Sequence, residues 1–334
     1  LYYFGQNPAL YDPSLAPFID RDAADAVQGQ RGGTAYLIYP FNKYTRAEMF
    51  GGYMHLNERY IDPALQQASQ AYQVDQYGST IFRNGHMMPL GFSLIRETTV
   101  FREYGPVSGN TFKVSFSTAP QWNQNWLGKQ TIDVDLRHYQ RLVNNGVLAM
   151  RLKGFRSWGP TPDFLYFGGN SEMRGYEYLQ FIGHKGFFAN VELRYPLVEA
   201  MLTPFGVLGG LRGVLFFNIG GSGFNNADFN AFETGTTLEP LLLGYTIIGN
   251  TVVPITTPVP VSGFRLVDSW ASYGIGLQTA VLGFPIHFDW AWKTKFNSTY
   301  EDVLFFYQAQ QAGRASGSEI FRHVKFAFWI GYDF

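Results

Sequence analysis

The sequence predicts an all-β protein whose antiparallel strands form a transmembrane barrel. Aromatic residues make up 18% of the 334 residues and charged residues only 15%, whereas a typical soluble domain has about 25% charged residues. A helix needs about 18 consecutive apolar residues to span a membrane, and the chain contains no such run. A closed barrel is the other way to cross lipid, because every backbone amide and carbonyl must be paired there.

Apolar and polar side chains alternate along several segments. At the end of the chain the apolar set comprises Val324, Phe326, Phe328, Ile330, Tyr332 and Phe334. The same period of two occurs in segments 112–117, 131–137, 190–195 and 286–292. This period places one set of side chains on lipid and the other in the lumen, as in the strands of outer-membrane barrels.

The predicted strands are segments 34–40, 43–57, 89–103, 110–120, 130–142, 146–157, 187–197, 207–219, 264–280, 284–295 and 322–334. Residues 1–4 fit the end of one more strand, which gives about twelve. Short and long connections mostly alternate, like the periplasmic turns and outer loops of a barrel. A soluble β-sandwich, the alternative, has no reason to follow that rule. We therefore expect a barrel of the bacterial outer membrane with a periplasmic C-terminus.

Two long connections carry further structure. Asp62-Pro63 predicts the start of a short helix, because aspartate caps helices and proline fits their first position. The connection 220–263 has apolar stretches on both sides of Gly249-Asn250, which predicts a hairpin with a two-residue turn. Its apolar residues include Leu241, Leu242, Leu243, Ile247 and Ile248. An exposed apolar surface of this kind is usually shielded from water, so either the loop folds over the barrel mouth or a partner packs on it.

Six landmarks follow one another from about residue 130 onward. They are Gly168–Tyr176, which ends in Met173-Arg174-Gly175-Tyr176, then Asn190–Leu197, Leu215–Gly220, Ser272–Leu277, Gly283–Trp290 and the terminal FAFWIGYDF. In this order the chain resembles the outer-membrane protein assembly and translocation superfamily, which includes BamA, TamA, the two-partner-secretion transporters and the bacterial surface antigens. The first 130 residues resemble it only in the succession of predicted strands and connections.

The resemblance implies a barrel of about sixteen strands, of which this chain holds the C-terminal portion, about twelve strands. The first strands and any periplasmic domain would lie upstream, in agreement with a start at Leu1 instead of Met. The resemblance also makes 159–186 an inward-folded loop, with Met173 in place of the usual valine of its motif.

In the family, the arginine of this loop pairs with acidic groups of late strands, because an unpaired guanidinium in a narrow lumen is costly. Arg174 is the matching residue here. Asn218 stands where the family usually has an aspartate, so a charged partner is missing at that position. Glu192 and Asp289 face the lumen by parity, and we expect them to replace it.

By the same resemblance, the last strand presents the signal for barrel assembly, carried here by Phe326, Phe328, Gly331, Tyr332 and Phe334. The implied partners are outer-membrane lipid (lipopolysaccharide and phospholipid), unfolded outer-membrane or secreted polypeptide clients, and other envelope subunits.

Other chemistry finds little support in the sequence. The net charge of −1 gives no reason to expect nucleic acid, and the absence of cysteine excludes disulfides and thiolate metal sites. The six histidines form no pair at metal-ligand spacing, Gly274-Ile275-Gly276 lacks the rest of a nucleotide fingerprint, and Ser222 lies in no nucleophile elbow. We expect no metal, no cofactor and no enzymatic activity.

Two functions of different classes remain. In the first, the barrel inserts outer-membrane proteins or passes polypeptide, with Arg174 holding the inner loop. In the second, it is a passive channel or a structural subunit of a larger envelope complex, and the apolar loop at 241–253 contacts a partner. The arginine-bearing loop favours the first function, and the apolar loop favours the second.

Overall fold

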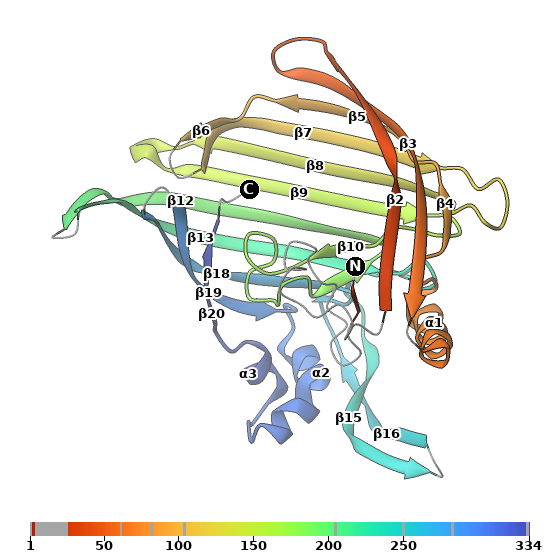
Figure 1. Cartoon of the computed structure of the whole chain (residues 1–334). Helices are drawn as coiled ribbons and strands as arrows, with labels where there is room; N and C mark the ends of the chain where they lie inside the picture. Colours follow the sequence, from red (N-terminus) through yellow and green to blue (C-terminus); the bar gives the residue numbers. More distant parts are fainter. Residues whose placement is uncertain are drawn as a thin grey trace.

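The chain forms one large curved antiparallel sheet, with smaller sheets and α-helices in its loops (Figure 1). This is a computed structural model. It describes residues 2–3, 26–60, 62–80, 83–102, 105–203, 206–248, 251–281, 284–331 and 334.

Strand order in the main sheet follows the chain, and each strand pairs antiparallel with the next. Its path is β1 (Tyr2–Tyr3), β2 (Ala26–Pro40), β3 (Thr45–Tyr60), β5 (Leu90–Glu97), β7 (Gly105–Ala119), β8 (Lys129–Arg141), β9 (Val147–Trp158), β12 (Lys185–Thr203), β13 (Gly206–Gly223), β18 (Ser269–Val281), β19 (Phe284–Thr294) and β20 (Lys325–Ile330). Two short strands, β4 (Gly85–Met87) and β6 (Val100–Arg102), pair with β3 and β7. In the part of the chain that the structure describes, β1 and β20 do not pair with each other.

The prediction of an all-β fold is confirmed, and each predicted strand segment overlaps a strand. Two segments are interrupted, however. Segment 89–103 is divided between β5 and β6, and segment 264–280 between β17 (Arg265–Leu266) and β18. In the second case the amides of Val267 and Asp268 donate to carbonyls of the preceding loop, so the backbone joins the main sheet only at Ser269.

The two faces of the sheet differ in polarity. One face, called the inner face below, buries polar and charged side chains, among them Asn190, Glu192, Arg194, Asn218 and Asp289. The outer face exposes large apolar side chains, among them Phe116, Ile132, Leu215, Ile275 and Phe328. A soluble sandwich buries its apolar face instead. The sheet therefore has the polarity of a membrane barrel wall.

Three two-stranded sheets lie in the loops. They pair β10 (Leu165–Phe167) with β11 (Phe181–Gly183), β14 (Phe232–Glu233) with β17, and β15 (Thr237–Ile248) with β16 (Thr251–Val261). Of these, the sequence predicted only the long hairpin of β15 and β16. Strands of two or three residues have no detectable periodicity, which is why the other two sheets were not predicted.

Helix α1 (Pro63–Tyr77) begins where the sequence predicts, since the Asp62 carboxylate accepts from the amide of Ala64 and proline occupies the first turn. Helices α2 (Ser298–Gln311) and α3 (Gly317–Phe321) were not predicted. They are capped by Asn297 and Ser316, whose side chains accept from backbone amides of the first turn. No helix within the described ranges is both long and apolar enough to cross a membrane.

The hairpin of β15 and β16 lies in the connection between the neighbouring strands β13 and β18 and projects away from the main sheet beside α2 (bottom of Figure 1). Leu241 packs against a buried cluster of Val261, Tyr300 and Val303, so α2 covers the base of the hairpin. Farther along, Leu243 is half-exposed and Ile247 and Ile248 are 73% and 65% exposed. Of the two alternatives for this loop, the base of the hairpin is covered by α2 of the chain itself, whereas contact of the exposed outer end with a partner stays a prediction. The predicted turn at 249–250 lies outside the described residues.

The end of the chain departs from the prediction of one strand over 322–334. Strand β20 stops at Ile330, and Phe334 is buried beside Tyr139 and Ala149 of the inner face. Phe334 thus does not continue the outward set of Phe326 and Phe328. The period of two holds only while the backbone remains extended, and the ladder with β19 ends at Ile330.

Candidate functional site

Residues 168–176, called the arginine loop below, lie against the inner face. The loop follows β10 and returns through β11, whose antiparallel pairing holds its two ends together. Inside it, the amides of Glu172 and Met173 donate to the carbonyl of Gly169, and the amide of Tyr176 donates to the carbonyl of Met173. These local bonds make the loop compact, which fixes the direction in which Arg174 points.

Met173 and Tyr176 attach the loop to the sheet. Both are buried in an aromatic cluster with Phe167, Phe181 and Phe188. The Tyr176 hydroxyl also donates to the carbonyl of Ala271 on β18 at 2.8 Å. Methionine is flexible enough to fill the gap between such rings.

Arg174 contacts two carboxylates on strands far apart in the sequence. Its Nη1 lies 2.7 Å from Glu192 Oε1 on β12, and its Nε lies 3.1 Å from Asp289 Oδ2 on β19. The guanidinium also lies 4.7 Å from the centre of the Phe216 ring on β13. The arginine is only 2% exposed. The structure thus brings together Arg174 and the two acidic residues that parity selected.

A second arginine completes this charge cluster. Arg194, two residues after Glu192 on the same face of β12, donates from Nε to Glu192 Oε2 at 2.8 Å. Arg174, Arg194, Glu192 and Asp289 are all nearly inaccessible, and they contribute two positive and two negative charges. Balanced charge is what a buried ionic network requires, since each uncompensated ion would carry a desolvation penalty of several kcal/mol.

Asp289 is oriented by neighbours on β18 and β20. The Trp329 indole donates to Asp289 Oδ2 at 2.7 Å, and His287 stacks on the Trp329 ring at 3.6 Å between centres. On β18, a side chain at Gly276 would place its Cβ 2.4 Å from Asp289 Oδ1. Glycine is therefore needed there to leave room for the carboxylate.

Asn218, the residue at the position where the resemblance implies an aspartate, makes neutral hydrogen bonds. Its side-chain oxygen accepts from Asn190 at 2.8 Å, and its amide donates to Ser272 at 3.1 Å. Asn190 in turn donates to the carbonyl of Glu172 in the arginine loop. Asn218 therefore reaches the loop through Asn190, by neutral hydrogen bonds across β12, β13 and β18.

Gly175 lets the loop approach β19 closely. Its φ is +88°, and an added Cβ would lie 3.0 Å from the Cβ of Ala291. We expect Gly175→Val to lower the free energy of unfolding by about 2 kcal/mol, because it adds backbone strain as well as this clash. Urea unfolding followed by tryptophan fluorescence measures the change. Gly154→Val is the matched control, because a Cβ there meets nothing within 4 Å; equal losses in both variants contradict the prediction.

The C-terminal residues divide between the two faces. Phe326 and Phe328 point outward and are 53% and 54% exposed. The Gly331 amide donates to the carbonyl of Pro285, whereas the Phe334 ring lies 5.3 Å from the guanidinium of Arg194 on the inner side. Tyr332 lies outside the described residues.

His184 joins three of the long loops on the side opposite the short turns. Its Nδ1 accepts from the amide of Asn225 at 3.3 Å, and its Nε2 lies 3.1 Å from Ser79 Oγ. Burial, together with the nearby charge of Arg83, lowers the pKa of His184 from 6.5 to about 4. The ring is therefore neutral when the loops are joined.

Acidification is expected to weaken this junction. The pKa of His184 is lower in the folded state, so between pH 6.5 and 4 the opened state binds a proton that the closed state does not. The free energy of opening should fall by about 2 kcal/mol from pH 7 to pH 5. Hydrogen exchange of the backbone amides at 79–80 and 223–227, corrected for the intrinsic pH dependence of amide exchange, measures this free energy. His184→Gln should remove the pH dependence; its persistence in that variant contradicts the assignment.

Within the described residues, no group of three or more histidine, aspartate or glutamate side chains could hold a metal ion. The structure nevertheless brings two histidines together that the sequence separates. His55 on β3 and His86 on β4 lie 4.7 Å apart between ring centres, and the Tyr53 hydroxyl is 2.6 Å from His86 Nδ1. Cross-strand pairing of β3 and β4, which sequence spacing does not reveal, produces this contact.

Sequence reasoning also missed one member of the charge cluster and two aromatic side chains beside it. Arg194, Phe216 and Trp329 each contact Arg174 or one of its carboxylates. The available signal was parity, because Arg194 shares a face of its strand with Glu192. For Phe216 and Trp329, only the tertiary arrangement places an aromatic ring beside the guanidinium.

Comparisons with known proteins agree with this architecture. The family model of the Omp85 superfamily domain matches residues 22–334. Among solved structures, the chain is similar to the crystal structure of BamA from Haemophilus ducreyi lacking POTRA domains 1–3, with 15% sequence identity and a TM-score of 0.54. That match covers 82% of this chain and 52% of the other, so this chain spans about half its length. No curated protein matched the sequence.

Proposed function

Because the chain belongs to the Omp85 superfamily, whose members are outer-membrane β-barrel proteins, we propose that it assists the insertion of outer-membrane proteins or the passage of polypeptide across that membrane. The observation that carries the proposal is the charge cluster around Arg174. Its arginine lies between β12 and β19 and holds an inward-folded loop against the inner face, an arrangement that enclosing a pore does not require. The cluster ties a loop to four late strands, β12, β13, β19 and β20.

This arrangement suits a machine whose wall has to be held in a defined state while it handles a client. The arginine loop fixes the late strands from inside, while β20 is joined to the sheet through β19. An unpaired strand edge is a template for another chain. We propose unfolded outer-membrane or secreted polypeptides as clients, with the short turns and the C-terminus on the periplasmic side and the outer face in lipopolysaccharide and phospholipid.

Assisted insertion into proteoliposomes tests the proposal. An unfolded outer-membrane protein is added to liposomes that carry the full-length protein, its Arg174→Ala variant or no protein, and folding is followed by heat-modifiable migration on gels. Arg96→Ala is the matched control, because Arg96 lies on the exposed face of β5, opposite Ser93 and Ile95. Acceleration that is lost with Arg174→Ala and kept with Arg96→Ala supports the function. No acceleration by the wild-type protein rejects it.

A structural subunit of an envelope complex is the second candidate, and the hairpin of β15 and β16 is the observation that favours it. The hairpin carries no charged residue from Pro240 to Val261. Its outer end exposes Tyr245, Ile247, Ile248 and Val252. Apolar surface of this kind is typical of a contact with another molecule. This candidate predicts that the insertion assay shows no acceleration with either form of the protein.

A further inference from the structure

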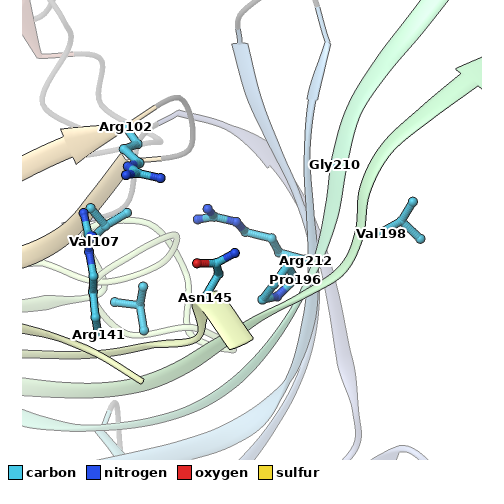
Figure 2. Close-up of a pocket in the computed structure, with 9 residues that line it drawn as sticks. Arg102, Val107, Arg141, Asn145, Pro196, Val198, Gly210 and Arg212 are labelled. Atoms are coloured by element: carbon cyan, nitrogen blue, oxygen red, sulfur yellow. The ribbon is translucent and has the colours of Figure 1, made fainter. Parts of the chain in front are cut away.

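Three arginines surround a cavity on the inner face, at the end of the sheet where the short turns lie. They are Arg102 at the end of β6, Arg141 at the end of β8 and Arg212 on β13 (Figure 2). The cavity has a volume of about 130 Å³, and Asn145, Val107, Val147, Pro196, Val198 and Gly210 complete its lining. Figure 2 shows the three side chains approaching one space from different strands. We call this site the arginine cavity.

Register places the cavity on the inner face. Arg141 pairs with Val147 across β8 and β9, two residues beyond Tyr139, which packs against Phe334 inside the sheet. Arg212 likewise lies two residues before Val214, which belongs to a buried cluster with Phe216. Alternate residues of a strand share a face. The cavity is therefore a continuation of the polar interior and not part of the lipid-facing surface.

Several cations elsewhere on this face pair with carboxylates of the chain. Arg137 and Arg151 both pair with Asp135, Lys153 pairs with Asp133, and Arg46 pairs with Glu48. Arg102 and Arg141 differ: within the described ranges neither one makes an ion pair or a side-chain hydrogen bond. Both are exposed. The arginine cavity thus places two guanidinium groups without an ion-pair partner among the described residues beside an open space.

We propose that the arginine cavity binds carboxylate side chains of an acidic polypeptide segment that enters the inner face from the short-turn end. Guanidinium groups bind carboxylates through two parallel hydrogen bonds, so Arg102 and Arg141 supply fitted donors. The Asn145 side chain can add a neutral donor. The apolar lining contributed by Val107, Val147 and Val198 fits the methylene groups of glutamate.

A polypeptide fits this position better than a phospholipid. A lipid headgroup brings acyl chains, which need apolar surface, but the neighbouring inner face carries Asp135, Arg137 and Arg151. Acyl chains would be more stable on the outer face, where Phe112 and Leu152 are exposed. The inference concerns binding alone, so it stands or falls independently of any insertion activity.

Fluorescence anisotropy with a fluorescein-labelled decaglutamate peptide tests the proposal on the full-length protein in detergent. The double variant Arg102→Gln/Arg141→Gln should weaken binding by at least about tenfold, because two charge-assisted pairs are removed. Arg96→Gln, at the same end of the sheet but on the opposite face, should change it less than about twofold. The charge reversal Arg102→Glu/Arg141→Glu should bind a decalysine peptide in place of decaglutamate.

Two results overturn the proposal. One is equal loss of affinity in the double variant and in Arg96→Gln, which indicates only general electrostatic attraction. The other is binding of short-chain phosphatidylglycerol that depends on Arg102 and Arg141 while decaglutamate does not bind, which indicates a headgroup site. Photocrosslinking of a benzophenone-bearing decaglutamate to the wild-type protein tests the location of the binding site even if a variant fails to fold. Crosslinks at residues 100–107 and 141–147 support the site, and crosslinks confined elsewhere reject it.

Discussion

Arg174→Ala is expected to lower the free energy of unfolding by about 3 to 5 kcal/mol, the cost typical of removing one partner from a buried ion pair. The variant removes the guanidinium that pairs with Asp289 and one of the two guanidinium groups that pair with Glu192. Both carboxylates are almost fully inaccessible, so water cannot replace the guanidinium. Equilibrium unfolding in guanidinium chloride, followed by tryptophan fluorescence, measures the loss.

A charge-balanced variant separates the cost of unpaired charge from the loss of packing. In Arg174→Met/Asp289→Asn, one positive and one negative charge are removed together, and Glu192 keeps its hydrogen bond from Arg194. We expect this double variant to be clearly more stable than Arg174→Ala. If the two are equally destabilised, the contribution of Arg174 comes from contacts with Phe216 and its neighbours, and the electrostatic explanation fails.

Glu301→Ala should have the second largest effect, a loss of about 3 kcal/mol in the local stability of α2 and α3. Glu301 is fully buried at the start of α2. It accepts from the amide of Lys295 at 2.6 Å and from Arg322 Nε at 2.6 Å, so it connects the end of β19 to the segment that precedes β20. Hydrogen exchange of residues 298–321 measures the change, and faster exchange is expected.

Two further variants make this prediction specific. Glu301→Gln keeps an acceptor for the Lys295 amide but removes the charge that pairs with Arg322, so its loss should be intermediate. Glu319→Ala removes a carboxylate that is half-exposed and weakly paired, at 3.6 Å from Arg314, and should change stability by less than about 0.5 kcal/mol. Unchanged exchange in Glu301→Ala would show that aromatic packing alone holds the helices.

The strands were predictable because the alternation of apolar and polar residues recurs in each of them. A period of two with apolar residues on one face located the main strands, and the same parity placed Glu192 and Asp289 inside, where Arg174 contacts them. Parity does not specify which inward residues meet across the interior. That depends on strand order and on the loop conformation, so Arg194 and Trp329 were recognised only in three dimensions.

The sequence did not predict α2 and α3, and it predicted the wrong end for the last strand, in both cases for local reasons. Helix α2 has apolar residues on several sides, because Tyr300 and Val303 pack on the hairpin while Phe305 stacks on Phe321. Its apolar pattern therefore gives no clear helical period, although Asn297 was available as a cap signal. For Phe334, the alternation was extended beyond Ile330, where strand pairing ends.

The contact between Arg174 and Asp289 also has a kinetic consequence. Arg174 belongs to a loop between β9 and β12, but its partner is on β19, near the end of the chain. Contacts between distant parts of a chain form late, because the intervening segment must be ordered first. We therefore expect Arg174→Ala to leave the folding rate nearly unchanged and to accelerate unfolding, as is usual for contacts absent from the transition state. The arginine loop would then determine how long the folded wall persists, while its rate of formation depends on the strand pairings that precede it.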